Sequence, residues 1–269
     1  YNHHMNLPLP VHILERIALE AMRAGERKLL ARFKKLTPRD IGYKANREIV
    51  TNADRASNNA IIKILRRHTP EFDIISEESA PRRKSNCVWI LDPLDGTTNF
   101  TVELPVWGIS LACVCNHVIE LGVISLPVLG ERYLAKKGAG AWRIVGKKKE
   151  RLHVSKTREM RDAFGLLCAG YRKEEIRRGE RTSSRLALVS RSVRRLGAAV
   201  VEAMWVATGR ADYSILEGVH PWDVAAGALI VTEAGGDVTT PHGKPWTLHE
   251  PNILFSNPHL TKQLHRLLQ

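Results

Sequence analysis

The sequence has little cysteine: four residues among 269, at positions 87, 113, 115 and 168. So few cysteines at such irregular spacing do not suggest a disulfide framework, and they fit a reducing, cytoplasmic environment best. Cys113-Val114-Cys115 lacks a second Cys or His pair at the spacing of a zinc site. Small side chains on one face of a buried strand are the simpler interpretation.

Long apolar runs and phosphate-loop glycines are also absent. No apolar stretch approaches the roughly 20 residues that cross a bilayer, so no membrane association is expected. The segment 1–10 has no cationic stretch before an apolar run, so no secretory signal is visible, and it is left out of the fold argument. The glycines at 138, 140 and 146 do not have P-loop or dinucleotide-loop spacing, which excludes both motifs.

The composition is that of an ordinary globular protein with excess positive charge. Hydrophobic residues make up 43% and charged residues 26% of the chain. The formal net charge of +13 favours anionic partners, such as phosphorylated metabolites, nucleic acid or a membrane surface, although solubility alone would also explain it. The length suffices for one large α/β domain or two closely packed halves.

The spacing of apolar residues predicts the main elements. Apolar residues recur at helical spacing over 11–34, which predicts a long amphipathic helix. Thr51 or Asn52 can cap a second helix, with Asp54 in its first turn. The region 107–135 is β-rich, and strands and helices alternate after about residue 155. The remaining predictions are strands at 72–76, 88–91, 163–168, 193–196 and 211–216, a polar loop at 81–85, and helices at 182–190, 198–207, 258–268 and from about 223 to the glycines at 235 and 236.

The most informative segment is WILDPLDGTTNF, residues 89–100. The apolar run 88–91 predicts a buried strand that ends at Asp92, because Pro93 interrupts ladder pairing. Asp95 follows, and the turn Gly96-Thr97-Thr98 can place backbone N–H groups around an anion. Two carboxylates beside such a turn suit hard cations bound next to a phosphate.

Further acidic residues lie where strands or loops meet helix starts. Each has a plainer interpretation: Asp54 as a helix N-terminal acid, Glu77 and Glu78 as solvated loop acids, and Asp223 as a helix cap. Taken with Asp92 and Asp95, they form a set of carboxylates that a fold could bring together. Taken singly, none of these four residues decides between structure and chemistry.

The run 89–100, with EES at 77–79 and WDVAAG at 222–227, resembles the inositol monophosphatase family of Mg²⁺-dependent, lithium-sensitive sugar phosphatases. The likeness covers nearly the whole chain and includes VTNAD at 50–54, GERYLAKKGAGAW at 130–142, RRLGAAVVEAMWVATGRAD at 194–212 and TEAGG at 232–236. It implies an α/β (α+β) fold layered αβαβα, of the inositol monophosphatase and fructose-1,6-bisphosphatase type. The active site would lie between an N-terminal half, 11–155, and a C-terminal half, 156–269, packed as one unit.

The resemblance also assigns roles. Metal ligands would be Glu77, Asp92, Asp95, Asp223 and the Leu94 carbonyl. Asp54 and Thr97 would orient the attacking water, with Glu77 as its general base. Backbone N–H groups of Gly96, Thr97 and Thr98 would hold the phosphate. On the substrate side would lie Gly197, Ala198, Ala199, Glu217 and Asp223, with Lys44 near the site, although a solvated loop lysine is an equal interpretation of that residue.

Elementary chemistry agrees with these roles. Clustered carboxylates repel one another unless cations neutralise them. Oxygen ligands without His or Cys favour Mg²⁺ or Mn²⁺ over Zn²⁺, and the resemblance implies two or three Mg²⁺ per site. Such metals would activate water for direct in-line attack on a phosphate monoester, and no phosphoenzyme is expected.

Substrate choice is less defined. Family members commonly carry an acid seven residues before the distal Asp, to contact inositol hydroxyls; here that position is Leu216, and Glu217 is one step later. A one-residue shift in a strand turns a side chain to the other face, so either a bulge restores Glu217 or the polyol site is altered. Inositol 1-phosphate is the first candidate substrate. Histidinol phosphate, fructose 1,6-bisphosphate and phosphorylated nucleotides are the alternatives.

Two other functional classes remain open. The segment 172–195 carries nine Lys and Arg residues and could bind RNA or a transcription complex, although acids interleave and Tyr171 is the sole aromatic nearby. A catalytically silent interaction protein is the other class, and the intact acidic set argues against it. The resemblance further implies a homodimer.

Overall fold

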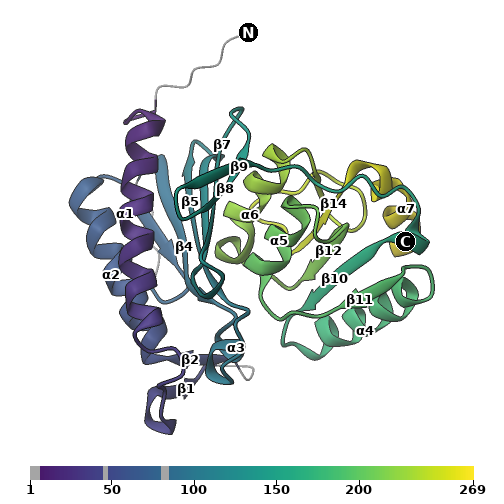
Figure 1. Ribbon diagram of the computed structural model, residues 1–269, viewed down its shortest axis with the longest axis horizontal. Helices are drawn as coiled ribbons and strands as arrows, with labels where there is room; N and C mark the ends of the chain where they lie inside the picture. Colours follow the sequence, from purple (N-terminus) through teal and green to yellow (C-terminus); the bar gives the residue numbers. More distant parts are fainter. Residues whose placement is uncertain (1–6, 45–47, 80–84) are drawn as a thin grey trace.

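The computed structural model describes residues 7–44, 48–79 and 85–269 and has five layers (Figure 1). A helix pair, a seven-stranded sheet, a second helix pair, a five-stranded sheet and a last helix pair follow one another across the molecule. The αβαβα fold class predicted from the sequence is therefore confirmed. Most of the segment left out of the fold argument, 1–6, and most of the predicted polar loop, 81–84, lie outside the described residues.

The first layer consists of α1 (Val11–Leu30) and α2 (Asn52–His68). Both are amphipathic, and their apolar stripes pack on one face of the first sheet. The Thr51 hydroxyl accepts the Ala53 N–H at 3.0 Å, which caps α2 as predicted. Helix α1 ends at Leu30, short of the predicted 34, and a two-stranded hairpin, β1 (Ile41–Tyr43) and β2 (Ile49–Thr51), connects it to α2.

The seven-stranded sheet has the order β3-β4-β5-β6-β7-β8-β9. Strands β3 and β4 are parallel, and the others pair antiparallel with their neighbours. The short helix α3 (Thr97–Thr101) follows β4. The strands are β3 (Asp73–Ser76), β4 (Cys87–Asp95), β5 (Gly108–Cys115), β6 (Val118–Leu126), β7 (Glu131–Lys136), β8 (Ala141–Val145) and β9 (Lys148–Arg151).

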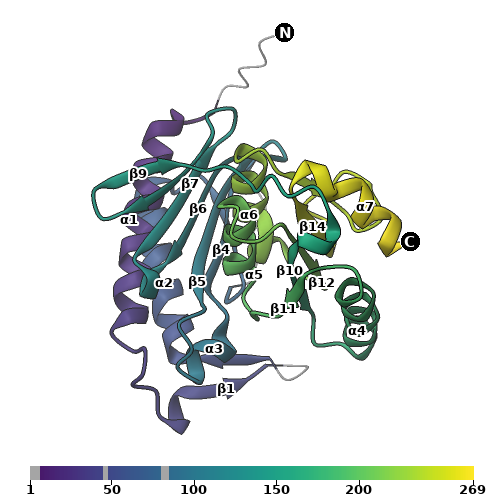
Figure 2. The ribbon, with the colours of Figure 1, turned by 45° about the vertical axis from the view of Figure 1, so that its right-hand side comes forward.

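The central layer, α5 (Ala199–Ala207) and α6 (Pro221–Glu233), is apolar on all sides. A helix of that kind must be buried, and both lie between the two sheets (Figures 1 and 2). Because α6 begins at this depth, its first-turn Asp223 enters the interior of the molecule.

The five-stranded sheet has the order β11-β10-β12-β14-β13, with β10, β11 and β12 parallel. Helices α4 (Lys173–Ala187) and α7 (Pro258–Leu268) cover its outer face (Figure 2). The strands are β10 (Phe164–Ala169), β11 (Ser192–Arg194), β12 (Tyr213–Glu217), β13 (Asp237–Thr239) and β14 (Asn252–Ser256). The predicted boundary near residue 155 falls between the two sheets, and the division into halves itself stays a prediction.

The cysteine interpretation needs a correction. Cys87 and Cys115 face each other across the antiparallel β4–β5 pair and form a disulfide, which the low cysteine count did not suggest. Cys113 is a free, buried residue on β5, as the strand interpretation required. Cysteine usage therefore no longer supports a reducing compartment, and the cytoplasmic placement stays a prediction. Among the described residues, no helix combines the length and apolar character of a membrane span.

Candidate active site

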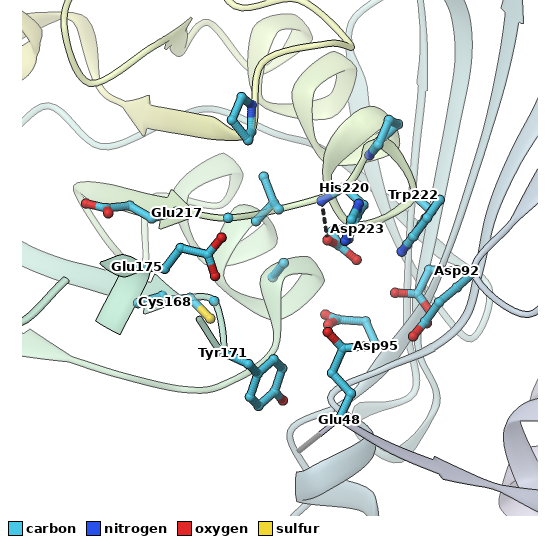
Figure 3. Close-up of a pocket in the computed structure, with 18 of the residues that line it drawn as sticks. Glu48, Asp92, Asp95, Cys168, Tyr171, Glu175, Glu217, His220, Trp222 and Asp223 are labelled. Atoms are coloured by element: carbon cyan, nitrogen blue, oxygen red, sulfur yellow. Dashed lines mark hydrogen bonds between the residues drawn. The ribbon is translucent and has the colours of Figure 1, made fainter. Parts of the chain in front are cut away.

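A pocket of about 730 Å³ opens where the two sheets and the central helices meet. Its walls come from Lys44 after β1, the start of β2, the end of β4, the α3 turn, the ends of β10 and β12, the start of α4 and the start of α6 (Figure 3). The predicted residues on these walls are Lys44, Glu77, Asp92, Leu94, Asp95, Gly96, Thr97, Thr98, Gly197, Ala199, Glu217 and Asp223. Two predicted residues, Asp54 and Ala198, lie behind the walls and are almost fully buried.

A β-bulge places Asp92 and Asp95 together. Side chains three apart on a regular strand point to opposite faces. Between the pairs Asp92–Ser110 and Asp95–Gly108, strand β4 carries one residue more than β5, so the alternation is reset. Both carboxylates therefore face the pocket (Figure 3). The strand was predicted to end at Asp92, but pairing resumes at Asp95 after Pro93, and the Ser57 hydroxyl holds the Pro93 carbonyl at 2.9 Å.

Asp95 also fastens the N-terminus of α5 to the site. Its carboxylate accepts the Val200 N–H at 2.7 Å. The Asn99 side-chain amide donates to the Val106 carbonyl at 2.7 Å and to the Leu196 carbonyl at 2.8 Å, which draws the segment before α5 against the α3 turn. Gly96 has φ +83°, and a Cβ there would lie 2.9 Å from the Val106 oxygen. The sharp turn after Asp95 therefore requires glycine.

Asp223 reaches the pocket from the first turn of α6. Pro221 starts the helix, and the Asp223 carboxylate accepts the His220 N–H at 2.7 Å. This cap holds the carboxylate opposite those of Asp92 and Asp95 (Figure 3). The Asp223 side chain therefore both caps α6 and lines the pocket.

Glu77 directly follows the last residue of β3. Its N–H donates to the Leu91 carbonyl of β4 at 3.2 Å, which holds it beside the end of that strand. Its carboxylate accepts the Lys44 ammonium at 2.8 Å, and Lys44 also pairs with Glu78. Burial lowers the pKa of Lys44, but these two carboxylates raise it above its ordinary value. Lys44 is therefore a fixed charge bound to Glu77 rather than a solvated loop residue.

Asp54 and Thr97 form a hydrogen-bonded pair under the pocket. The Thr97 hydroxyl lies 3.0 Å from Asp54 Oδ1 and 3.0 Å from the Leu94 carbonyl. Burial raises the pKa of Asp54 to about 6, although hydrogen bonds from Thr51 and Thr97 favour the ionised form. The Thr97 hydroxyl donates its proton to Asp54 or to the Leu94 carbonyl, so its oxygen is free to accept a hydrogen bond from a water molecule.

Unbalanced negative charge dominates the electrostatics. Burial raises the pKa of Asp95 to about 7, against the N–H groups that favour its ionised form. Burial and the neighbouring carboxylates also raise the pKa values of Asp92 and Asp223. A donor set of carboxylates without His or Cys fits a hard divalent cation. Within the described ranges, however, no three acidic, His or Cys side chains are already arranged to hold a metal ion, so the carboxylates would have to turn inward to share one.

Several pocket residues escaped the sequence analysis. Figure 3 shows the Glu48 carboxylate beside that of Asp95, and the walls also include Tyr171, Glu175 and His220. Glu48 could have been noticed as an acid four residues after Lys44 in the same hairpin. Glu175 had no such signal, because its segment was interpreted as a basic surface.

The comparisons with known proteins agree with this geometry. The model of the inositol monophosphatase family matches residues 12–269. A fructose-1,6-bisphosphatase/inositol-1-monophosphatase of Thermotoga maritima is 36% identical over 78% of this chain and 78% of its own. The Nus factor SuhB of Pasteurella multocida is 32% identical over 94% of each chain. The solved structure of an IMPase from Thermotoga maritima superposes with a TM-score of 0.86 at 31% identity, covering 96% of this chain and 97% of that one. The chain is therefore a member of the inositol monophosphatase family.

Proposed function

We infer that this phosphatase-family chain is a Mg²⁺-dependent phosphomonoesterase acting on a small phosphorylated polyol, with inositol 1-phosphate as the first candidate. One observation carries the inference: a single pocket is lined by four carboxylates from both halves of the chain, Glu77, Asp92, Asp95 and Asp223. The Asp54–Thr97 pair lies beneath the same pocket. Carboxylates and a hydroxyl–carboxylate pair are the groups that metal-assisted hydrolysis of a phosphate ester needs.

The residues fit a divalent cation as follows. Glu77, Asp92, Asp95, Asp223 and the Leu94 carbonyl would hold two or three Mg²⁺, or Mn²⁺, after Glu77 exchanges its contact with Lys44 for the ion. A bound divalent cation supplies Lewis-acid stabilisation of the charge on the phosphoryl and leaving oxygens. A phosphate dianion would otherwise be repelled by the acidic wall.

The chain's own groups provide the remaining chemistry. Thr97 and Asp54 orient the attacking water, and Glu77 accepts its proton. Gly96 caps the short helix α3, which begins at Thr97, and the N–H groups of Gly96, Thr97 and Thr98 would hold phosphate oxygens. Asp223 faces the leaving-group side from the opposite wall. Direct transfer to water then needs no phosphoenzyme.

A phosphate-release panel tests this proposal. The substrates are inositol 1-phosphate, fructose 1,6-bisphosphate, histidinol phosphate and 3′-phosphoadenosine 5′-phosphate, each assayed with Mg²⁺ and with EDTA. We expect release only with Mg²⁺ and the highest kcat/KM for inositol 1-phosphate. A higher kcat/KM for fructose 1,6-bisphosphate would favour the fructose-1,6-bisphosphatase activity that the name of the Thermotoga relative also gives. Release that persists in EDTA would refute the metal assignment.

A second candidate function, binding to RNA or a transcription complex, has one structural observation in its favour. Helix α4 exposes a row of arginines, and relatives are named Nus factors. Neighbouring carboxylates neutralise part of this positive charge, because Arg195 pairs with Glu180 at 2.7 Å and Arg178 pairs with Glu217. A salt titration of RNA affinity tests this function: binding that is absent near physiological salt ends it. The predicted homodimer is a separate proposal, and sedimentation velocity would test it.

A further inference from the structure

The substrate end of the pocket holds two carboxylates that point in opposite directions. Glu217 ends β12, and Glu175 lies in the first turn of α4. Figure 3 shows the Glu217 carboxylate directed away from Asp223 and Asp95, whereas the Glu175 carboxylate is directed into the space facing them. The choice between these two side chains bears on what the pocket recognises beyond the phosphate.

The Glu217 carboxylate is already bound by side chains of the protein. The Arg178 guanidinium and the Thr182 hydroxyl, both from α4, bind its two oxygens, the latter at 3.3 Å. Its side chain is only 4% exposed. No bulge returns this carboxylate to the pocket, because β12 pairs in continuous register with both β10 and β14 through Glu217. Withdrawing it from Arg178 would leave a charge unpaired, which is costly at a buried site.

Glu175 is held in place by backbone. One oxygen accepts the Arg172 N–H at 3.0 Å, which caps α4. The carboxylate lies over Gly170 and Gly218, and a Cβ on Gly218 would come within 2.9 Å of Oε1, while a Cβ on Gly170 would collide with Oε2. Gly218 has φ +71°, so glycine is favoured there by conformation as well as by space. Two glycines therefore leave a slot that fits this carboxylate.

The seated carboxylate has acceptor capacity left. A carboxylate offers about four lone-pair sites, and the Arg172 N–H uses one of them. Among the residues that the structure describes, its ion pair is with the Arg172 guanidinium, which is 3.9 Å from Oε1 and lies on a side chain that is 71% exposed. With 16% of its side chain exposed into the pocket, Glu175 can accept hydrogen bonds from two adjacent hydroxyls of a bound molecule.

From this geometry we propose that Glu175 is the specificity residue that binds the hydroxyls of the substrate's polyol, the task that Glu217 cannot perform in this chain. The inference rests on the phosphatase function proposed above. It also defines the substrate class: a monophosphate whose far end carries neutral hydroxyls. A second phosphate at that end would meet the Glu175 charge.

The test compares two substrates and two matched variants. Inositol 1-phosphate carries the hydroxyls, and p-nitrophenyl phosphate lacks them. Glu175→Gln removes the charge and keeps a side chain that can cap the helix. Glu174→Gln makes the same change on the neighbouring, solvent-exposed residue of α4 and serves as the control. Melting temperatures of all three proteins establish that they are folded.

We expect Glu175→Gln to lower kcat/KM for inositol 1-phosphate about tenfold or more, since hydrogen bonds to a charged group are stronger than those to a neutral amide. The value for p-nitrophenyl phosphate should stay within about twofold of wild type, and Glu174→Gln should change neither. Equal losses on both substrates, no loss on either, or a selective loss in Glu217→Gln instead would overturn the inference while the phosphatase function stands. A wild-type protein that releases phosphate from neither substrate would refute the proposed function, and this inference with it.

Discussion

Neutralising one acid of the site should stabilise the metal-free protein and abolish its response to metal. We choose Asp223→Asn, because asparagine retains an oxygen that can accept the His220 N–H. Asp95 sets the scale: its pKa rises from 3.8 to about 7, and three units correspond to about 4 kcal/mol of unfavourable charge in the folded state. The pKa of Asp223 is shifted in the same direction by burial and by Asp95, so removing its charge should make the metal-free protein more stable than wild type at pH 8.

The pH of the experiment is chosen from the direction in which burial shifts the pKa of these carboxyl groups. A carboxyl group whose pKa is raised in the folded state costs nothing below its unfolded pKa, and the cost grows as the pH rises to the folded pKa. The cost is therefore larger at pH 8 than at pH 4, where it should nearly vanish. For a chain of this length about 1 kcal/mol corresponds to about 2 °C, so a gain on the scale of Asp95 would raise the melting temperature of the variant by about 8 °C in EDTA at pH 8.

The assay is thermal unfolding followed by circular dichroism, in EDTA and in saturating Mg²⁺. Wild type should gain stability with Mg²⁺, because a ligand that binds the folded state stabilises it, and Asp223→Asn should gain little. Asp162→Asn is the matched control, because it makes the same change at an exposed acid that does not line the pocket. If Asp223→Asn were less stable than wild type in EDTA and responded to Mg²⁺ equally, the idea of a repelling, metal-binding acid cluster would be refuted.

Three further predictions concern single groups. Burial raises the pKa of Glu202 to about 8, so its charge destabilises the fold increasingly from about pH 4.5 to 8; Glu202→Gln should flatten the dependence of melting temperature on pH over that window, and an unchanged slope would contradict the assignment. Thr97→Val removes the hydroxyl bonded to Asp54 and should lower kcat about a hundredfold with little change in KM, whereas a kcat near wild type would exclude the water-orienting role. Replacing both Cys87 and Cys115 by alanine opens a link between residues 28 apart and should cost about 3 kcal/mol in chemical denaturation, and an unchanged unfolding midpoint would show that the disulfide does not contribute.

Parts of the site could be predicted from the sequence because they depend on local patterns. The apolar strand before Asp92, the glycine turn after Asp95 and the cap at Thr51 each leave a short signature in the chain. Simple alternation, however, would have placed Asp92 and Asp95 on opposite faces. The bulge that unites them depends on the pairing partner β5, which local sequence does not describe.

The parts that were missed depend on distant partners. Helix α4 begins at Lys173 rather than at the predicted 182, because its first turns are nearly all charged and present few apolar residues from which to detect the helix. Once α4 extends to its true start, Glu175 reaches the pocket and Arg178 reaches Glu217. Likewise the Cys87–Cys115 disulfide follows from the β4–β5 register, and the low cysteine count could not reveal it.

The central claim is that the carboxylates at the meeting point of the two sheets hold divalent ions. Anomalous diffraction from crystals grown with Mn²⁺ tests it directly. We expect anomalous peaks within ligand distance of Asp92, Asp95 and Asp223, with Glu77 turned from Lys44 toward one of them. Crystals at saturating Mn²⁺ with no peak in this pocket, or with the Lys44–Glu77 pair intact and manganese bound elsewhere, would contradict the account.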